Sequence, residues 1–252
     1  MRQNQFNEAL LQLAAKFGVT DELNHSVNKP DIRKRAARQD EPDGTRSFEL
    51  NDAFTEDELR ILGPRVTQGD ADALHWHSVK WITTVKNREV LVKSSNSHYP
   101  IFMRECLVKP ANGEGEEEKF YKVYEPLNCD KGFRFSYTPA GKKPQRYING
   151  LSELKEAYRQ YNEEEERAWN SCHDDCKPYR TKKLPEAFIC SGERDSLCCR
   201  SMGFHPLWFN SETYRLSAEE YREIMTYVEV LYNIPDIDET GIRKGRELAL
   251  TY

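Results

Sequence analysis

Two short acidic stretches near the C-terminal end of the chain have the composition of a metal site. The first is CSGERDSL at residues 190–197, and the second is IPDIDETG at residues 234–241. Each follows an apolar run that predicts a buried strand, and each precedes a predicted helix. Open α/β sheets usually bind ligands at the C-terminal ends of their parallel strands. Carboxylates placed there suit Mg²⁺, which takes one or two of them and completes its shell with water and phosphate.

Either stretch alone has an ordinary structural explanation, because Asp-x-Asp before a glycine also occurs in turns and at helix N-caps. Together they are more specific, with Glu193 and Asp236 43 residues apart. The four candidate carboxylates are Glu193, Asp195, Asp236 and Asp238. Four such groups brought together without a metal would repel one another, so a divalent cation, Mg²⁺ or Mn²⁺, is expected.

Residues 187–252 resemble the Toprim domain of primases, type IA and type II topoisomerases and small nucleases. The resemblance depends on Gly-Glu-x-Asp at 192–195, on Asn-Ser-Glu at 210–212 after a strand, and on Asp-x-Asp-x-x-Gly at 236–241. Within that group the chain is most similar to the primase region of phage and mobile-element primases and primase-helicases. A further stretch, residues 119–151, matches weakly.

The sequence departs from the commonest Toprim pattern at one position. A Glu normally stands directly before the Gly as general acid/base or metal ligand, and here Ser191 holds that place. In an extended chain Glu193 would point to the same side as Ser191 and take over its role. The resemblance therefore implies Glu193 as the catalytic residue, with the acid/base assignment open, and Asp195, Asp236 and Asp238 as metal ligands.

The resemblance implies a DNA primase that makes RNA primers on single-stranded DNA during replication of a phage or mobile element. The reaction would be metal-assisted nucleotidyl transfer from ribonucleoside triphosphates, in the cytoplasm, with a replicative helicase as a further partner. One alternative is a Toprim nuclease that uses the same metal with water as nucleophile. Another is a non-catalytic module that binds single-stranded DNA or a helicase, which Ser191 favours.

A basic segment precedes the Toprim-like region. Phe133, Phe135, Tyr137 and Tyr147 are interleaved with five basic residues: Lys131, Arg134, Lys142, Lys143 and Arg146. Basic side chains neutralise phosphates and aromatic rings stack on unpaired bases. The resemblance favours a DNA- and nucleotide-binding groove here, and the alternative is a lysine-rich hairpin surface that binds nothing.

The periodicity predicts an α+β protein with three regions. Residues 1–50 would hold an N-terminal helix at 4–17 and a mobile linker at 24–44, which has few large apolar residues. Residues 51–185 would form a mixed, mostly β region. Residues 186–252 alternate strand and helix, which predicts a central parallel or mixed sheet. A Toprim domain normally continues with another strand and helix, so this third region is expected to be incomplete.

Several elements of the middle region have specific signals. The capping box Thr55-x-x-Glu58 predicts a helix that Gly63 ends. Alternating residues from 79 to 92 predict a hairpin that turns at 86–88, and three further strands are expected at 99–108, 120–124 and 133–137. Residues 152–169 predict a long surface helix.

Composition excludes several classes of protein. The net charge of −5 argues against a generally basic nucleic-acid coat. No run of 18 apolar residues occurs, so no membrane span or membrane partner is expected. The N-terminus lacks the layout of a signal peptide, and the seven Cys are therefore expected as free thiols. No pair of CxxC motifs and no helicase P-loop is present.

Overall fold

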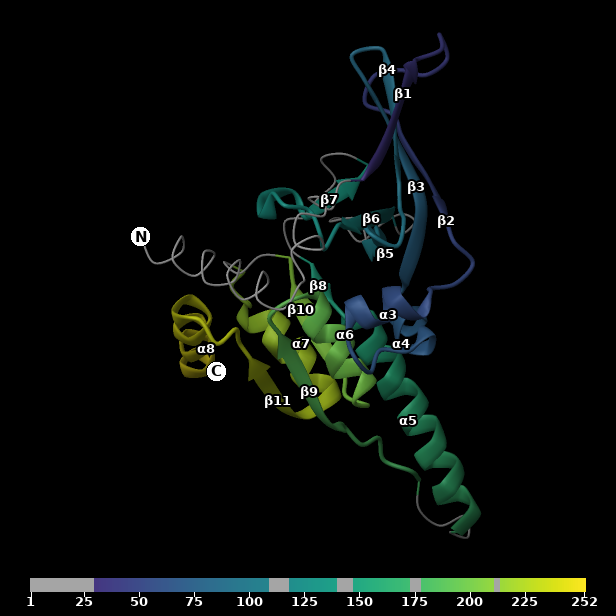
Figure 1. The fold of residues 1–252 in the computed structure, drawn as a ribbon. Helices are drawn as coiled ribbons and strands as arrows, with labels where there is room; N and C mark the ends of the chain where they lie inside the picture. The colour runs from purple at the N-terminus through teal and green to yellow at the C-terminus, as the bar shows by residue number, and fades with distance from the viewer. Residues whose placement is uncertain (1–29, 109–117, 140–146, 173–177, 211–213) are drawn as a thin grey trace, which may run out of the picture.

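The chain has a mixed α+β fold built on two sheets, as the sequence predicts (Figure 1). The computed structural model describes residues 30–108, 118–139, 147–172, 178–210 and 214–252. The helix expected at 4–17 lies outside these residues. No described helix is long and apolar enough to cross a membrane.

The first sheet is an antiparallel half-barrel of seven strands in the order β1-β4-β3-β5-β6-β7, with β2 paired to β3. The strands are β1 (Asp31–Ala36), β2 (Arg46–Leu50), β3 (Trp76–Lys86), β4 (Glu89–Ser94), β5 (Phe102–Val108), β6 (Glu118–Tyr124) and β7 (Phe135–Thr138). A short 3-10 helix, η1 (Lys131–Phe133), precedes β7. The predicted hairpin and the further strands are confirmed. Figure 1 shows that β1, β2, β3 and β4 extend beyond the rest of the molecule as a ribbon.

The mobile linker expected at 24–44 is wrong for its described part, residues 30–44. Strand β1 pairs with β4 over six residues, from Asp31 opposite Ser94 to Ala36 opposite Glu89. All six residues of β1 are exposed. An edge strand of a ribbon is held by backbone hydrogen bonds and cross-strand pairs, so it forms without the apolar side chains that a core requires.

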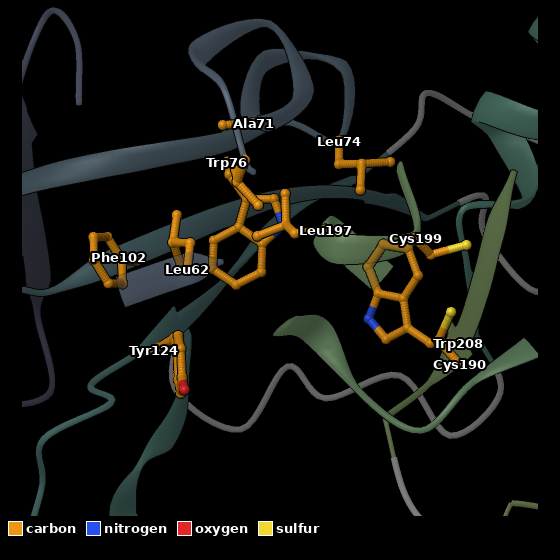
Figure 2. Close-up of a cluster of buried hydrophobic side chains, with 11 residues drawn as sticks. Leu62, Ala71, Leu74, Trp76, Phe102, Tyr124, Cys190, Leu197, Cys199 and Trp208 are labelled. Carbon is orange, nitrogen blue, oxygen red and sulfur yellow. The ribbon is translucent and has the colours of Figure 1, made fainter. Parts of the chain in front are cut away.

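Two short helices, α3 (Glu56–Leu62) and α4 (Gln68–Ala73), pack beneath the half-barrel. The capping box predicted for Thr55 and Glu58 is present, and α3 ends at Gly63. The helices contribute to a core cluster that joins the two sheets (Figure 2). Its buried members are Leu62, Val66, Ala71, Leu74, Trp76, Phe102, Tyr124, Cys190, Leu197, Cys199 and Trp208.

The second sheet has the order β11-β9-β10-β8. Its strands are β8 (Ile148–Asn149), β9 (Leu184–Cys190), β10 (Pro206–Phe209) and β11 (Val228–Ile234). Strand β9 is parallel to β10 and to β11, whereas β8 is antiparallel to β10. The prediction of a mixed sheet with helical connections is therefore confirmed. Among the described strands β11 is an edge, and its Val230, Tyr232 and Ile234 are exposed.

Helices cover both faces of the second sheet. The long helix α5 (Leu151–Cys172) confirms the prediction for 152–169, and it packs with α7 (Ala218–Tyr227) on one face. Helix α6 (Glu193–Ser201) packs on the other face, toward the half-barrel. Helix α8 (Glu239–Thr251) follows β11 and has no buried residue, although Leu248 packs partly against the α5–α7 cluster.

Candidate functional site

The ends of β9 and β11 meet at one edge of the second sheet. Ile234, the last residue of β11, is the register partner of Cys190, the last residue of β9. The expectation that these two strands are parallel neighbours is confirmed. Neighbouring strands lie about 5 Å apart, so the two acidic stretches start from adjacent points.

A cavity of about 610 Å³ lies at this edge. Its walls come from the ends of β9, β10 and β11, from residues 214–216 and from α8. Polar lining residues include Ser191, Arg215, Asp236, Asp238 and Lys244, and apolar ones include Phe209, Tyr214, Leu216, Leu248 and Tyr252. An apolar cavity of this size with a few convergent polar groups is typical of a ligand-binding site.

Asp236 and Asp238 are exposed side chains that line this cavity. Asp238 is also the N-cap of α8, where its Oδ1 accepts a hydrogen bond from the backbone N–H of Gly241 at 2.7 Å. The ordinary explanation of an Asp before a helix therefore applies to Asp238, while Asp236 has no capping role.

Two glycines allow α8 to lie close to the loop that carries these carboxylates. A Cβ at Gly241 would lie 2.4 Å from the backbone oxygen of Asp236. A Cβ at Gly245 would lie 2.7 Å from Cγ of Pro235. Asn233 adds a hydrogen bond from its Nδ2 to the Gly245 carbonyl at 3.3 Å. The glycine of Asp-x-Asp-x-x-Gly is thus required by the packing of the helix against the loop.

Glu193 does not line the cavity. It is 6% exposed, and its carboxylate accepts a hydrogen bond from Nζ of Lys122 on β6. Helix α6 begins at Glu193 itself, after the N-cap Gly192. The prediction that Glu193 points to the same side as Ser191 assumed an extended chain, and it fails because the chain is already helical there.

Asp195 is an exposed residue of the first turn of α6, and its carboxylate accepts a hydrogen bond from the Ser191 hydroxyl. Within the described part of the chain, no three His, Cys, Asp or Glu side chains form a metal-binding group. The four carboxylates expected in one cluster are therefore divided. Asp236 and Asp238 face the cavity, Asp195 is linked to it through Ser191, and Glu193 is turned toward the half-barrel.

A buried set of charged and polar groups joins the two sheets beside Glu193. Lys122 also donates to Oδ1 of Asn210 at 3.2 Å, and its Nζ lies 4.5 Å from the centre of the Phe135 ring. Burial lowers the pKa of Lys122, and the nearby Glu193 opposes that shift. Asn210 belongs to the Asn-Ser-Glu stretch at 210–212, and Ser211 and Glu212 lie outside the described residues.

Arg104 is the second buried cation at this junction, with 1% exposure. Its guanidinium donates to the Leu74 carbonyl, to Asn149 and to Glu153, and it lies over the ring of Trp208. Sequence reasoning missed both cations. The available signal was period-two alternation, since Lys122 shares a strand face with the buried Phe120 and Tyr124.

The basic segment is described only in part. Arg134 is partly buried, and its Nε donates to the Asn128 carbonyl at 3.3 Å. The backbone of Lys131 lies in η1, but its side chain is outside the described set. Lys142, Lys143 and Arg146 fall outside the described residues. Phe133 is 70% exposed, as a stacking residue would be. The nucleic-acid groove stays a prediction.

Comparisons with known proteins give no relative: no protein-family model, no curated protein and no solved structure matches the chain.

Proposed function

We propose that the chain is a metal-dependent nucleotidyltransferase of the Toprim primase type, which makes RNA primers on single-stranded DNA. The observation that carries the proposal is the cavity at the C-terminal ends of β9, β10 and β11, with Asp236 and Asp238 in its wall. Ligands of open α/β sheets bind at this edge. The resemblance of residues 187–252 to Toprim domains comes from the same two carboxylates.

The residues of the cavity fit a hard divalent cation. Asp236 and Asp238 supply carboxylate oxygens at an exposed position, where water and phosphate oxygens have room to complete the shell. Mg²⁺ or Mn²⁺ bound there would neutralise charge on the phosphoryl oxygens and orient the attacking and leaving groups. Ser191 and Asp195, hydrogen-bonded to each other at the end of β9, extend the polar edge beside that position.

The cavity also offers positive charge to an anionic substrate. Lys244 lies in its wall, with Nζ 3.0 Å from the Glu247 carboxylate, and Arg215 lines it from the segment before α7. These cations would contact triphosphate oxygens of a ribonucleotide. Glu193 is withdrawn from the cavity by Lys122, so its role here is to position α6 rather than to transfer a proton.

Replacing Asp236 and Asp238 together by Asn tests the proposal. Asn is a good N-cap, so the substitution removes charge and retains the start of α8. We expect the double variant to lose Mg²⁺ binding in calorimetry and to lose primer synthesis from labelled ribonucleotides on single-stranded templates. The matched control is Glu239→Gln, which removes an exposed carboxylate from the first turn of α8 and should retain both. Undiminished Mg²⁺ affinity and synthesis in the double variant would refute the proposal.

A non-catalytic module that binds single-stranded DNA or a helicase is the second candidate. The burial of Glu193 against Lys122 favours it, because together with Ser191 it leaves no Glu at the usual acid/base position. The same assay separates the candidates. A module binds the template without making primers, and a Toprim nuclease shortens it.

A further inference from the structure

Two buried cysteines contact each other between the second sheet and α6. Cys190 is the last residue of β9 and Cys199 lies on α6, and they are 3% and 2% exposed. Their side chains are hydrogen-bonded to each other. Figure 2 shows the two sulfur atoms beside the ring of Trp208. Paired thiols of this kind, nine residues apart in sequence, have the proximity that a disulfide requires.

The hydrogen bond makes the two sulfurs unequal. It lowers the pKa of Cys199, although burial acts in the opposite direction. The same hydrogen bond and burial raise the pKa of Cys190. Since the thiolate is the reactive form of cysteine, Cys199 is the sulfur prepared for attack and Cys190 is its proton-bearing neighbour.

The cavity gives a small molecule a route to this pair, because Cys190 belongs to its wall. Cys106 is an instructive contrast. It is also buried, but its sulfur interacts with the Arg104 guanidinium and burial raises its pKa. A buried thiol without a second thiol beside it cannot resolve an oxidised form into a disulfide.

We propose that Cys190 and Cys199 form a redox modification site that reacts with a hydroperoxide and closes to a reversible disulfide. The Cys199 thiolate attacks the terminal oxygen of the hydroperoxide, the O–O bond breaks, and the corresponding alcohol, or water from hydrogen peroxide, leaves. Cys199 is then a sulfenic acid. The Cys190 sulfur attacks the Cys199 sulfur, the S–O bond breaks, and water leaves with the thiol proton. Two thiols have lost two electrons and two protons, and the peroxide has gained them.

The cross-link would act on the candidate site without belonging to it. Cys190 directly precedes Ser191, so a bond to the body of α6 fixes the edge from which the 191–195 stretch starts. This inference does not depend on the nucleotidyltransferase proposal, because it concerns the thiols alone.

The experiment exposes the full native chain to a few equivalents of hydrogen peroxide, blocks the remaining thiols with iodoacetamide, and maps peptides by mass spectrometry without reduction. We expect a Cys190–Cys199 peptide as the main intramolecular cross-link, a loss of two of the seven thiols, and full recovery with dithiothreitol. The Cys199→Ser variant should lose the cross-link, whereas Cys106→Ser should retain it.

The wild-type protein decides the outcome even if a variant fails to fold. Oxidation of the exposed Cys129 and Cys172 with Cys190 and Cys199 still free would overturn the proposal. So would a Cys190 or Cys199 that is linked mainly to other cysteines, because the geometry between β9 and α6 would then not direct the reaction.

Discussion

Lys122 and Glu193 form an ion pair in which both side chains are buried, at 5% and 6% exposure. The pair connects β6 of the half-barrel with the first residue of α6, which packs on the second sheet. Removing one partner of a buried pair leaves the other charge without compensation, whereas removing both does not.

We expect Lys122→Met to lower the free energy of unfolding by about 3–5 kcal/mol, because Glu193 stays buried without its partner. Adding Glu193→Gln should recover a large part of that loss. Urea unfolding of the two single variants and the double variant measures the coupling. A Lys122→Met protein as stable as the wild type would show that Glu193 reaches water in solution.

The edge of the ribbon should respond to acid through Glu41. Its hydrogen bonds with the Arg35 side chain and the Arg38 backbone lower the pKa of Glu41 to about 2. A carboxylate with a lowered pKa contributes stability above its unfolded pKa and loses it as the pH falls through the folded value. The difference between wild type and Glu41→Gln should be constant above about pH 4.5 and should vanish near pH 2.

Acid unfolding curves for both proteins check this. Glu56→Gln is a suitable control, because this exposed carboxylate lies only 3.6 Å from Arg60 in a pair on α3 with both side chains exposed. A Glu41→Gln difference that is the same at pH 2 and pH 7 would contradict the assignment of β1 and its following turn.

The position of α8 should depend on Gly241. In Gly241→Ala the new Cβ meets the backbone oxygen of Asp236, which cannot move as a flexible side chain would. We expect a displaced α8 and weaker Mg²⁺ binding, seen in heteronuclear NMR spectra and calorimetry. Gly69→Ala on α4 is the control, since its Cβ would meet only Thr67 Oγ1 at 3.8 Å. That change should be neutral or stabilise by about 0.5–1 kcal/mol.

The basic segment makes a prediction about salt. If Lys131, Arg134, Lys142, Lys143 and Arg146 bind phosphates, changing all five to Ala should weaken single-stranded DNA binding. The slope of log K against log salt should become shallower by about 0.7 for each phosphate that is no longer neutralised. Arg222→Ala, on the exposed side of α7, controls for total charge. An unchanged slope in the five-fold variant would show that the segment is only a solvated surface.

Sequence patterns predicted most elements and the meeting of β9 with β11, because apolar period and capping are local signals. They placed Glu193 incorrectly, since the start of α6 depends on whether the chain turns helical at Gly192 or one residue later. They also missed the pairing of Lys122 with Glu193, whose positions are 71 residues apart. Such a pairing is decided by the way the two sheets pack and leaves no mark in either segment. Strand β1 was missed because its residues are all exposed and its order comes from the ladder with β4.

The open edge at β11 has a consequence for how the protein behaves at high concentration. Val230, Tyr232 and Ile234 are 43%, 46% and 45% exposed along a strand whose outer backbone groups pair with no described strand. Such an edge is a template for another extended chain, and charged side chains or proline are the usual protection against it. Glu229 and Pro235 provide that protection only at the two ends of the strand. Colloidal stability will therefore depend on protein concentration, and a lysine introduced at Val230 or Tyr232 is the simplest route to material that remains in solution.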